Sequence, residues 1–379
     1  MKVDAAAGVE SPEALRAEIG RLAGTLLAAR PDTPWRALAD GGLLALAVPA
    51  ACGGEGLGVA ETAVVLTALG HRALDTPALA TALGVLALAR WGSAQQQDTA
   101  LRPVATDAAG LTAVLNVGRR PDPQRPAVTA HRTGEGLELD GAAVGVPYAD
   151  TAHRMLVPVL LEREPALVLL DPQTPGVRRL PAPTSSGSPV SSVRFEAVPV
   201  PAAAVVPGGP APVADLYRLA GAGAAAVADG LVAGALELTA GHVATRRQFG
   251  RPLVTLQAVA LQLADVAIVS RTLHLAAVAA AEALDAVNPD PDAWADAEVA
   301  ALLAVEDARC AIATTHHLHG GTGVDLSYPL PAYSAAATDL AHLLGGPGRG
   351  LAALASRLAD PDRDEDRDED PDQGPGDRS

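Results

Sequence analysis

The sequence predicts an α+β protein in which a helical segment, a segment of short strands and a second helical segment follow one another. The first segment carries apolar residues at helical spacing from Leu15 to Leu26. Between about 103 and 210 the chain changes to short β-rich runs separated by turn residues. From Asp215 onward, stretches rich in Ala, Leu and Gly return to helical spacing. We expect domains at 1–103, 104–211 and 212–360, followed by a disordered acidic tail at 361–379.

The individual elements follow from local signals. Ser11, Pro12 and Glu13 combine a capping hydroxyl, a first-turn proline and an acidic first turn, so a helix should run from here to about Ala29. Four more helices are expected in this domain, at 35–44, 59–69, 76–89 and 94–101. Strands are expected at 112–115, 127–131, 137–139, 154–159, 166–170 and 192–195. The third domain should be a four-helix bundle, with helices at 215–247, 256–284, 293–318 and 330–358.

The first helix of that bundle contains several glycines, each of which costs roughly 1 kcal/mol relative to alanine. Such a helix persists only where its neighbours pack tightly against it.

Composition and charge exclude several classes of protein. The 379 residues carry a net charge of −16, and no basic stripe with interleaved aromatic residues suits a nucleic acid. There is no uncharged apolar run of roughly 18 residues and no signal-peptide core near Met1, so we expect a cytoplasmic protein that does not enter a membrane. Cys52 and Cys310 lie far apart without ligand spacing, which predicts neither a disulfide framework nor a metal site.

The stretch from Thr245 to Pro252 is predicted to end one long helix and to lead into the next. Gly250 suits a left-handed residue just past a helix, and Pro252 cannot continue one. Arg246 and Phe249 are three residues apart and should share a face of the last turn. A planar donor fork beside an aromatic ring suits a phosphate next to a flat ring system. An ordinary charged helix terminus with an apolar plug is the alternative.

The stretch from Thr245 to Pro252 is one of several motifs that occur in order along the chain. Arg246-x-x-Phe249-Gly250-x-Pro252 is followed by Gln257, by Leu263-Ala264-Asp265 and by His317-Leu318-His319-Gly320-Gly321-Thr322-Gly323. Nearer the N-terminus stand Trp35-x-x-Leu38-x-x-x-Gly42-Leu43 and Val48-Pro49-x-x-x-Gly53-Gly54-x-Gly56. In this order, the motifs resemble the acyl-CoA dehydrogenase family over nearly the whole chain. The resemblance implies that family's fold, with an N-terminal helical domain, a small central β-domain and a C-terminal four-helix bundle.

The resemblance also implies a cofactor and the residues that hold it. The family removes a proton and a hydride across the α,β bond of an acyl-CoA, with FAD and one glutamate base. Its conserved motifs hold the ADP half of an FAD seated across a subunit interface. In this sequence the corresponding residues are Arg246, Phe249, Gln257, His317, Gly320 and Gly321. His317 replaces the family's usual glutamine, so its charge depends on pH.

Other positions depart from the family pattern. The two places from which the family supplies its base correspond to Leu344 and to a site near Ala220, and neither is a carboxylate. The family's flavin-ring loops correspond to 116–121 and 145–147, and neither keeps the polar pattern. We therefore expect no catalytic residue at either usual position. The closest pattern within the family is the actinobacterial heterotetrameric type, in which one subunit keeps the base and a related subunit has lost it.

Three interpretations stay open at this point. The first is a non-catalytic subunit that contributes the FAD clamp to a catalytic partner. The second is a scaffold or acyl-CoA-binding protein of the same fold without flavin chemistry. The third is an active homo-oligomer that uses an unexpected base, for which Glu237 and Asp229 are candidates. The resemblance implies an acyl-CoA substrate, a homologous subunit in a hetero- or homo-tetramer, and an electron-transferring flavoprotein as partners. A composition with few aromatic and many small residues suits a roomy pocket, such as one for a steroid side-chain thioester. The high alanine content can equally reflect the base composition of the genome.

Overall fold

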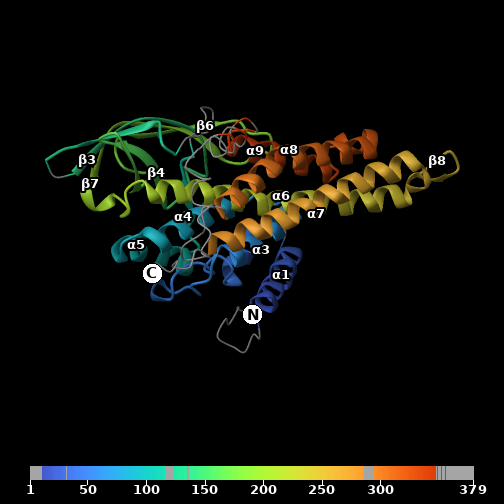
Figure 1. The fold of residues 1–379 in the computed structure, drawn as a ribbon, viewed down its shortest axis with the longest axis horizontal. Helices are drawn as coiled ribbons and strands as arrows, with labels where there is room; N and C mark the ends of the chain where they lie inside the picture. Colours follow the sequence, from blue (N-terminus) through green and yellow to red (C-terminus); the bar gives the residue numbers. More distant parts are fainter. Residues whose placement is uncertain are drawn as a thin grey trace, which may run out of the picture.

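A computed structural model of the chain describes residues 11–30, 32–115, 123–134, 136–285 and 293–346, together with 348, 351 and 355. A group of short helices, a sheet and a set of long helices follow one another along the chain (Figure 1). The sheet lies at one end of the molecule, and two of the long helices, α6 and α7, extend away from it. The expected tail at 361–379 lies outside the described residues.

The N-terminal helices form near their predicted positions, but the second ends at Asp40, whereas the sequence predicted its end at 44. They are α1 (Pro12–Ala29), α2 (Pro34–Asp40), α3 (Val59–Gly70), α4 (Ala78–Trp91) and α5 (Ala94–Asp107). The Ser11 hydroxyl accepts a 3.2 Å hydrogen bond from the Ala14 amide, which caps α1. The fully buried Ile19 and Leu27 hold α1 in a core that it shares with α2 and α3. Helix α5 continues through Pro103 to Asp107, whereas the sequence predicted its end at 101.

Among the described residues, seven strands form one mixed sheet. They are β1 (Leu111–Ala113), β2 (Val128–Arg132), β3 (Gly136–Pro147), β4 (Arg154–Leu161), β5 (Glu164–Leu170), β6 (Val177–Ala182) and β7 (Val190–Pro201). The strand order is β1-β4-β2-β3-β7-β6, and β5 pairs with β4. Strand β4 runs parallel to β1 and β2, and the other pairs are antiparallel. The core of this domain contains Met155, Val193 and Phe195.

The predictions for this sheet were too short at β3 and β7, and β6 was missed. Strand β6 carries Arg178, Arg179 and Pro181 and exposes most of its residues, so it lacks an apolar alternation. Its hydrogen bonds to β7 define it as a strand, and those pairings are not visible in local sequence.

The C-terminal helices are α6 (Ala211–Thr245), α7 (Gln257–Asp285), α8 (Ala293–His319) and α9 (Leu330–Leu343). Helix α6 is mostly buried and contacts the other three. Where α6 meets α3, a Cβ atom on Gly230 would lie 2.1 Å from the Thr67 carbonyl oxygen, and one on Gly234 would lie 2.1 Å from that of His71. The tight packing predicted for a glycine-containing helix is thus present.

Helix α9 ends earlier than predicted. It stops at Leu343, and Gly345 and Gly346 then adopt φ angles of 79° and 73°. These left-handed conformations end a helix readily at glycine. Most of the remainder of the predicted helix at 330–358 lies outside the described residues.

Two of the long helices also meet the length and composition expected of a membrane span. These are α6 and α7, and α6 is the buried core helix of the C-terminal domain. Helix α7 is buried over a much smaller share of its length.

Candidate functional site

The turn between α6 and α7 is a small β-hairpin. Strands β8 (Arg247–Gln248) and β9 (Arg251–Pro252) pair antiparallel around Phe249 and Gly250. Their φ angles are 50° and 76°. Two successive residues with positive φ fit a two-residue hairpin turn whose twist matches that of paired strands.

This geometry corrects the expected helix end. Helix α6 stops at Thr245, and Arg246 has an extended backbone with φ −66° and ψ 126°. Arg246 and Phe249 therefore do not share a helical face. The Arg246 carbonyl accepts a 2.9 Å hydrogen bond from the Leu253 amide, which closes the hairpin at its base. Gly250 has the predicted positive φ, but within the turn.

The hairpin presents its side chains to solvent. Phe249 is 86% exposed although its backbone is in the left-handed region, which is unfavourable for a bulky residue. Arg246 is also exposed, and Gln257 stands exposed at the first position of α7. In Figure 1 the hairpin, labelled β8, lies at the far end of the α6–α7 pair. These three predicted cofactor residues thus lie together on one projecting tip.

The other predicted cofactor residues lie where α8 ends. His317 is exposed in the last turn of α8, and Gly320 and Gly321 open the short 3₁₀ helix η4 (Gly320–Val324). Gly320 has a φ of 57°, which favours glycine. A Cβ atom on Gly321 would meet nothing in this chain within 4 Å, so packing within the chain does not require glycine there.

A pair of stacked histidines connects the hairpin end of α6 to the predicted cofactor residues at the end of α8. The rings of His242, in the last turn of α6, and His319, at the end of α8, stack with centroids 4.3 Å apart. The Nδ1 atom of His319 lies 2.8 Å from the Thr315 carbonyl oxygen, and its Nε2 atom lies 3.1 Å from the Tyr328 hydroxyl. The structure therefore links the end of α6, which carries Arg246, to the end of α8.

The surroundings of these histidines disfavour the charged form. Burial lowers the pKa of His319, although its bond to Thr315 acts in the opposite direction. Burial also lowers the pKa of His242, and the positive charges of His319 and Arg246 lower it further. The pKa of His316 is lowered mainly by burial and additionally by His319.

These lowered pKa values predict loss of stability in mild acid. Below the ordinary histidine pKa of about 6.5, the unfolded chain binds protons that the folded chain resists. The stabilisation is fully present above that pH and is lost as the pH falls toward the lower folded-state values. We expect the urea midpoint to fall between about pH 6.5 and pH 5, and to fall less steeply in His242→Phe, which keeps a ring beside His319.

The comparison between the two pH profiles isolates His242. Burial raises the pKa of Asp229 and Asp285, so these carboxyls act in the opposite direction, but both variants contain them. Parallel profiles for the wild type and His242→Phe would show that His242 does not contribute to the acid sensitivity.

A cavity of about 1020 Å³ lies between the N-terminal helices, the sheet and α9. Its wall is largely apolar, and the contribution of α3, α4 and α6 includes Leu66, Leu69, Leu79, Leu83, Val227 and Leu231. Gly145 and Pro147 of β3 also line it. The other predicted flavin-ring loop, at 116–121, lies outside the described residues.

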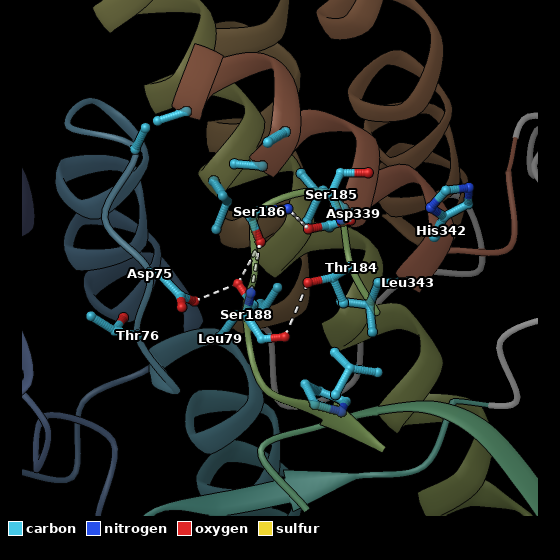
Figure 2. Close-up of a pocket in the computed structure, with 18 of the residues that line it drawn as sticks. Asp75, Thr76, Leu79, Thr184, Ser185, Ser186, Ser188, Asp339, His342 and Leu343 are labelled. Atoms are coloured by element: carbon cyan, nitrogen blue, oxygen red, sulfur yellow. Dashed lines mark hydrogen bonds between the residues drawn. The ribbon is translucent and has the colours of Figure 1, made fainter. Parts of the chain in front are cut away.

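Two carboxylates hold one loop at the edge of this cavity (Figure 2). The loop joins β6 to β7, and its Ser185 and Ser186 amides each donate a 2.8 Å hydrogen bond to Asp339 of α9. The Ser188 hydroxyl donates a 2.6 Å bond to Asp75, which follows α3. Asp75 also accepts a hydrogen bond from the Tyr148 hydroxyl, and burial, followed by this bond, raises the pKa of Tyr148.

Sequence reasoning did not find Asp75, Tyr148 or Asp339. They come from three separate parts of the chain and belong to no spaced motif, so only the fold brings them together. Ser188 and Asp339 are polar residues on a loop and a helix, and nothing in their local sequence marks them as neighbours of a cavity.

The two usual base positions are buried and apolar. Leu344 is 3% exposed and Ala220 is 1% exposed. Beside Ala220, a Cβ atom on Gly221 would lie 3.1 Å from the Ala297 carbonyl oxygen, so α8 packs closely there.

Neither alternative base lines the cavity. Glu237 has a side chain that is 75% exposed and lies 3.1 Å from His71 Nε2. The buried Asp229 carboxylate lies 3.0 Å from His274 Nδ1. Both carboxylates pair with histidines away from the cavity wall. This placement does not support a role for either as the catalytic base.

Comparisons with known proteins cover both helical parts of the chain. Residues 14–108 match the acyl-CoA dehydrogenase N-terminal domain, and residues 219–347 match the acyl-CoA dehydrogenase C-terminal domain. The Mycobacterium tuberculosis protein called acyl-CoA dehydrogenase FadE28 is 42% identical over 327 residues, which cover 86% of this chain and 92% of that protein.

Solved structures of the same fold also match this chain. A chain of the ChsE4–ChsE5 complex from Mycobacterium tuberculosis matches with a TM-score of 0.83 and 31% identity, covering 91% of this chain and 97% of that one. A variant of the Tcur3481–Tcur3483 steroid ACAD matches with a TM-score of 0.86 and 32% identity, covering 92% and 98%. The motifs, the fold and these matches together show that the chain belongs to the acyl-CoA dehydrogenase family.

Proposed function

We propose that this chain is a non-catalytic subunit of an FAD-dependent acyl-CoA dehydrogenase. In this proposal it binds a homologous catalytic subunit and contributes the residues that hold the ADP half of the FAD at the subunit interface. These residues are Arg246, Phe249, Gln257, His317, Gly320 and Gly321. The resulting assembly is a heterotetramer, since matching structures include heteromeric complexes of the same family.

The observation that carries the proposal is the projecting hairpin. Phe249 is 86% exposed in an unfavourable backbone conformation, and Arg246 and Gln257 are exposed beside it. Aromatic rings exposed on a strained turn are unfavourable for an isolated chain, so they favour a role in contact with another molecule. Arg246 offers a planar fork of donors that matches a diphosphate, and Phe249 offers a flat surface for an adjacent ring.

The residues at the end of α8 also fit an FAD diphosphate. The open space around Gly321 and the left-handed Gly320 leave room for a ligand to approach the backbone here. The exposed His317 adds a hydrogen-bond donor. When bound, FAD supplies the hydride acceptor of the family's reaction.

The described cavity wall supports a non-catalytic role. Abstraction of the α-proton needs a carboxylate within hydrogen-bond reach of the substrate carbon. Asp75 and Asp339 are the acidic residues on the described wall, and both accept hydrogen bonds from the loop that they hold. The catalytic glutamate therefore belongs to the partner subunit in this proposal.

Flavin stoichiometry tests the division of roles. We expect the isolated chain to bind FAD weakly and to show no acyl-CoA dehydrogenase activity. Co-expression with the most similar neighbouring gene product should yield a complex with stoichiometric FAD and turnover. Steady turnover by this chain alone, with one flavin per chain, would contradict the proposal.

Arg246 provides the sharper prediction. Arg246→Ala should weaken FAD retention in the co-expressed complex by about 1.5–3 kcal/mol, as expected for a lost charged hydrogen bond. Arg246→Lys should weaken it less, because an ammonium group keeps the charge but not the planar fork. Equilibrium dialysis with flavin fluorescence measures both effects.

The matched control is Arg251→Ala, which removes the same charge from the adjacent strand β9. Arg247 is less suitable as a control, because its Nη2 atom donates a 2.8 Å hydrogen bond to the Gly250 carbonyl and so supports the turn. Equal FAD retention in the Arg246 and Arg251 variants would reduce Arg246 to an ordinary basic residue near a helix end.

For the substrate, we propose an acyl-CoA with a bulky acyl group, such as a steroid side-chain thioester. The cavity volume of about 1020 Å³ and the similarity to a steroid ACAD support this class. Electron transfer to an electron-transferring flavoprotein and a cytoplasmic location are part of the same proposal. The second candidate is an acyl-CoA-binding scaffold without flavin chemistry, which the retained cavity favours. Acyl-CoA binding by a complex that never retains FAD would support that candidate instead.

A further inference from the structure

His319 is a buried polar residue that lies between the two groups of predicted cofactor residues. It is 5% exposed and directly precedes Gly320, where η4 begins. The chain itself covers its ring, so the ring is not open to a cofactor. Buried polar side chains are stable where hydrogen bonds satisfy them, and His319 uses both of its ring nitrogens in this way.

The two hydrogen bonds define the form of the His319 ring. A carbonyl oxygen only accepts, so the Nδ1 atom carries a proton and donates the 2.8 Å hydrogen bond to the Thr315 carbonyl. Burial lowers the pKa of His319 and so favours the neutral ring. The Nε2 atom of that neutral ring accepts the 3.1 Å hydrogen bond from the Tyr328 hydroxyl. The ring is therefore held in one tautomer and one orientation.

His319 joins three segments of the chain at one point. Thr315 lies one turn earlier on α8, so its bond ties the ring to its own helix. Tyr328 follows η4, so its bond ties down the far end of the turn that contains the two predicted glycines. The stack with His242, with centroids 4.3 Å apart and ring planes inclined by 26°, adds the last turn of α6.

The backbone of His242 leads directly to Arg246. The His242 carbonyl accepts a 2.8 Å hydrogen bond from the Arg246 amide, at the point where α6 ends. The Arg246 carbonyl in turn accepts the hydrogen bond from Leu253 that closes the hairpin. Two successive backbone hydrogen bonds therefore transmit the position of His242 to the base of the hairpin.

We propose that His242 and His319 are positioning residues for the FAD-binding residues of this chain. Their stacked rings set the place of Arg246 relative to Gly320 and Gly321. This inference rests on the proposed function, because it assigns both rings to the same site. Two segments that are distant in sequence bind one ligand tightly when their spacing is fixed before the ligand arrives, and the stack fixes that spacing.

FAD retention in the co-expressed complex tests the stack. His242→Ala removes one ring and should weaken FAD binding about tenfold in equilibrium dialysis. His242→Phe restores a flat ring beside His319, so it should recover most of that loss. Tyr328→Phe should weaken FAD binding about threefold, because it removes the hydroxyl that holds His319.

The matched control for Tyr328→Phe is Tyr333→Phe on α9. It also removes one tyrosine hydroxyl, which donates a 2.8 Å hydrogen bond to the His71 carbonyl at the end of α3. Tyr333→Phe should lower the stability of the protein without changing its affinity for FAD.

A double-mutant cycle separates positioning from general stability. When His242→Ala is added to Arg246→Ala, FAD binding should weaken by about threefold or less, because the guanidinium that His242 positions is already absent. A residue that only stabilised the fold would instead give its full tenfold effect in both backgrounds.

Hydrogen exchange in the full chain without flavin tests the connection directly. Tyr328 is distant in sequence from the hairpin, yet Tyr328→Phe should make the Arg246 and Leu253 amides exchange about threefold faster. His319→Ala should have a larger effect, and Tyr333→Phe should have none. Mass spectrometry of the peptide that spans 244–256 measures these rates. His319→Ala can fail to fold, and His242→Ala and Tyr328→Phe then carry the test.

Three results would overturn the proposal. The first is unchanged FAD retention in His242→Ala when Arg246→Ala loses FAD. The second is a full tenfold effect of His242→Ala in the absence of the Arg246 side chain. The third is unchanged exchange at Leu253 in His242→Ala and Tyr328→Phe. A complex that retains FAD equally without the Arg246 side chain would contradict the proposed function itself, and this failure is distinguishable because the exchange rates do not involve flavin.

Discussion

Replacing Gly230 with alanine should lower the unfolding free energy by about 3 kcal/mol, although alanine is the better helix former. The new Cβ atom would lie 2.1 Å from the Thr67 carbonyl oxygen and 2.6 Å from the His71 amide nitrogen. Both are backbone atoms of the α3 region and cannot rotate away, so α3 and α6 must separate. We expect the apparent Tm to fall by on the order of 4 °C in thermal unfolding followed by circular dichroism.

Gly241 supplies the matched control on the same helix. A Cβ atom there would meet nothing within 4 Å, so Gly241→Ala should raise stability by up to about 1 kcal/mol. A Gly230→Ala protein as stable as the wild type would mean that α3 and α6 can move apart freely, contrary to the close backbone contact described above.

Replacing Asp215 with alanine should destabilise the protein by about 3 kcal/mol. Asp215 is 7% exposed and accepts hydrogen bonds from Arg90 Nη1 at 3.0 Å and from Trp91 Nε1 at 2.9 Å. Arg90 also donates to the Leu284 carbonyl at the end of α7. Removing the carboxylate leaves a partly buried guanidinium and an indole N–H without their acceptor, and the urea midpoint should fall accordingly.

Two further variants separate charge from packing. Asp215→Asn keeps an acceptor for Trp91 but removes the charge, so it should lie between the wild type and Asp215→Ala. Asp98→Ala removes an exposed carboxylate from its pair with Arg102 on α5 and should change stability by less than about 1 kcal/mol. If Asp215→Ala were as mild as Asp98→Ala, the Arg90 pair would contribute no more than a surface ion pair.

Features encoded locally were predicted well from the sequence. The Ser11 cap, the helical stripe of α1 and the glycines of α6 each depend on residues close together in the chain, and the structure contains all three. The family fold was also predicted, because its motifs occur in order over most of the sequence. The positions of Arg246 and Phe249 were predicted as helical, although the chain forms a hairpin there.

That error has a physical cause. Gly250 fits both a helix C-terminus and a hairpin turn, because both place a residue at positive φ. Pairing between β8 and β9 decides between them, and Phe249 itself adopts positive φ, which its residue type does not predict. Strand β6 and the contacts of Asp75 and Asp339 were missed for a similar reason, since each depends on partners distant in sequence.

The length of α6 separates the cavity from the hairpin, so the two regions can change independently during evolution. Leu231 lines the cavity, and Arg246 stands fifteen positions later, about 22 Å farther along the helix axis. Substitutions that remove an acid from the cavity therefore leave the hairpin undisturbed. After duplication of an ancestral gene, one copy can lose its catalytic residue while natural selection still preserves its hairpin. A pair of subunits that each depend on the other can arise in this way.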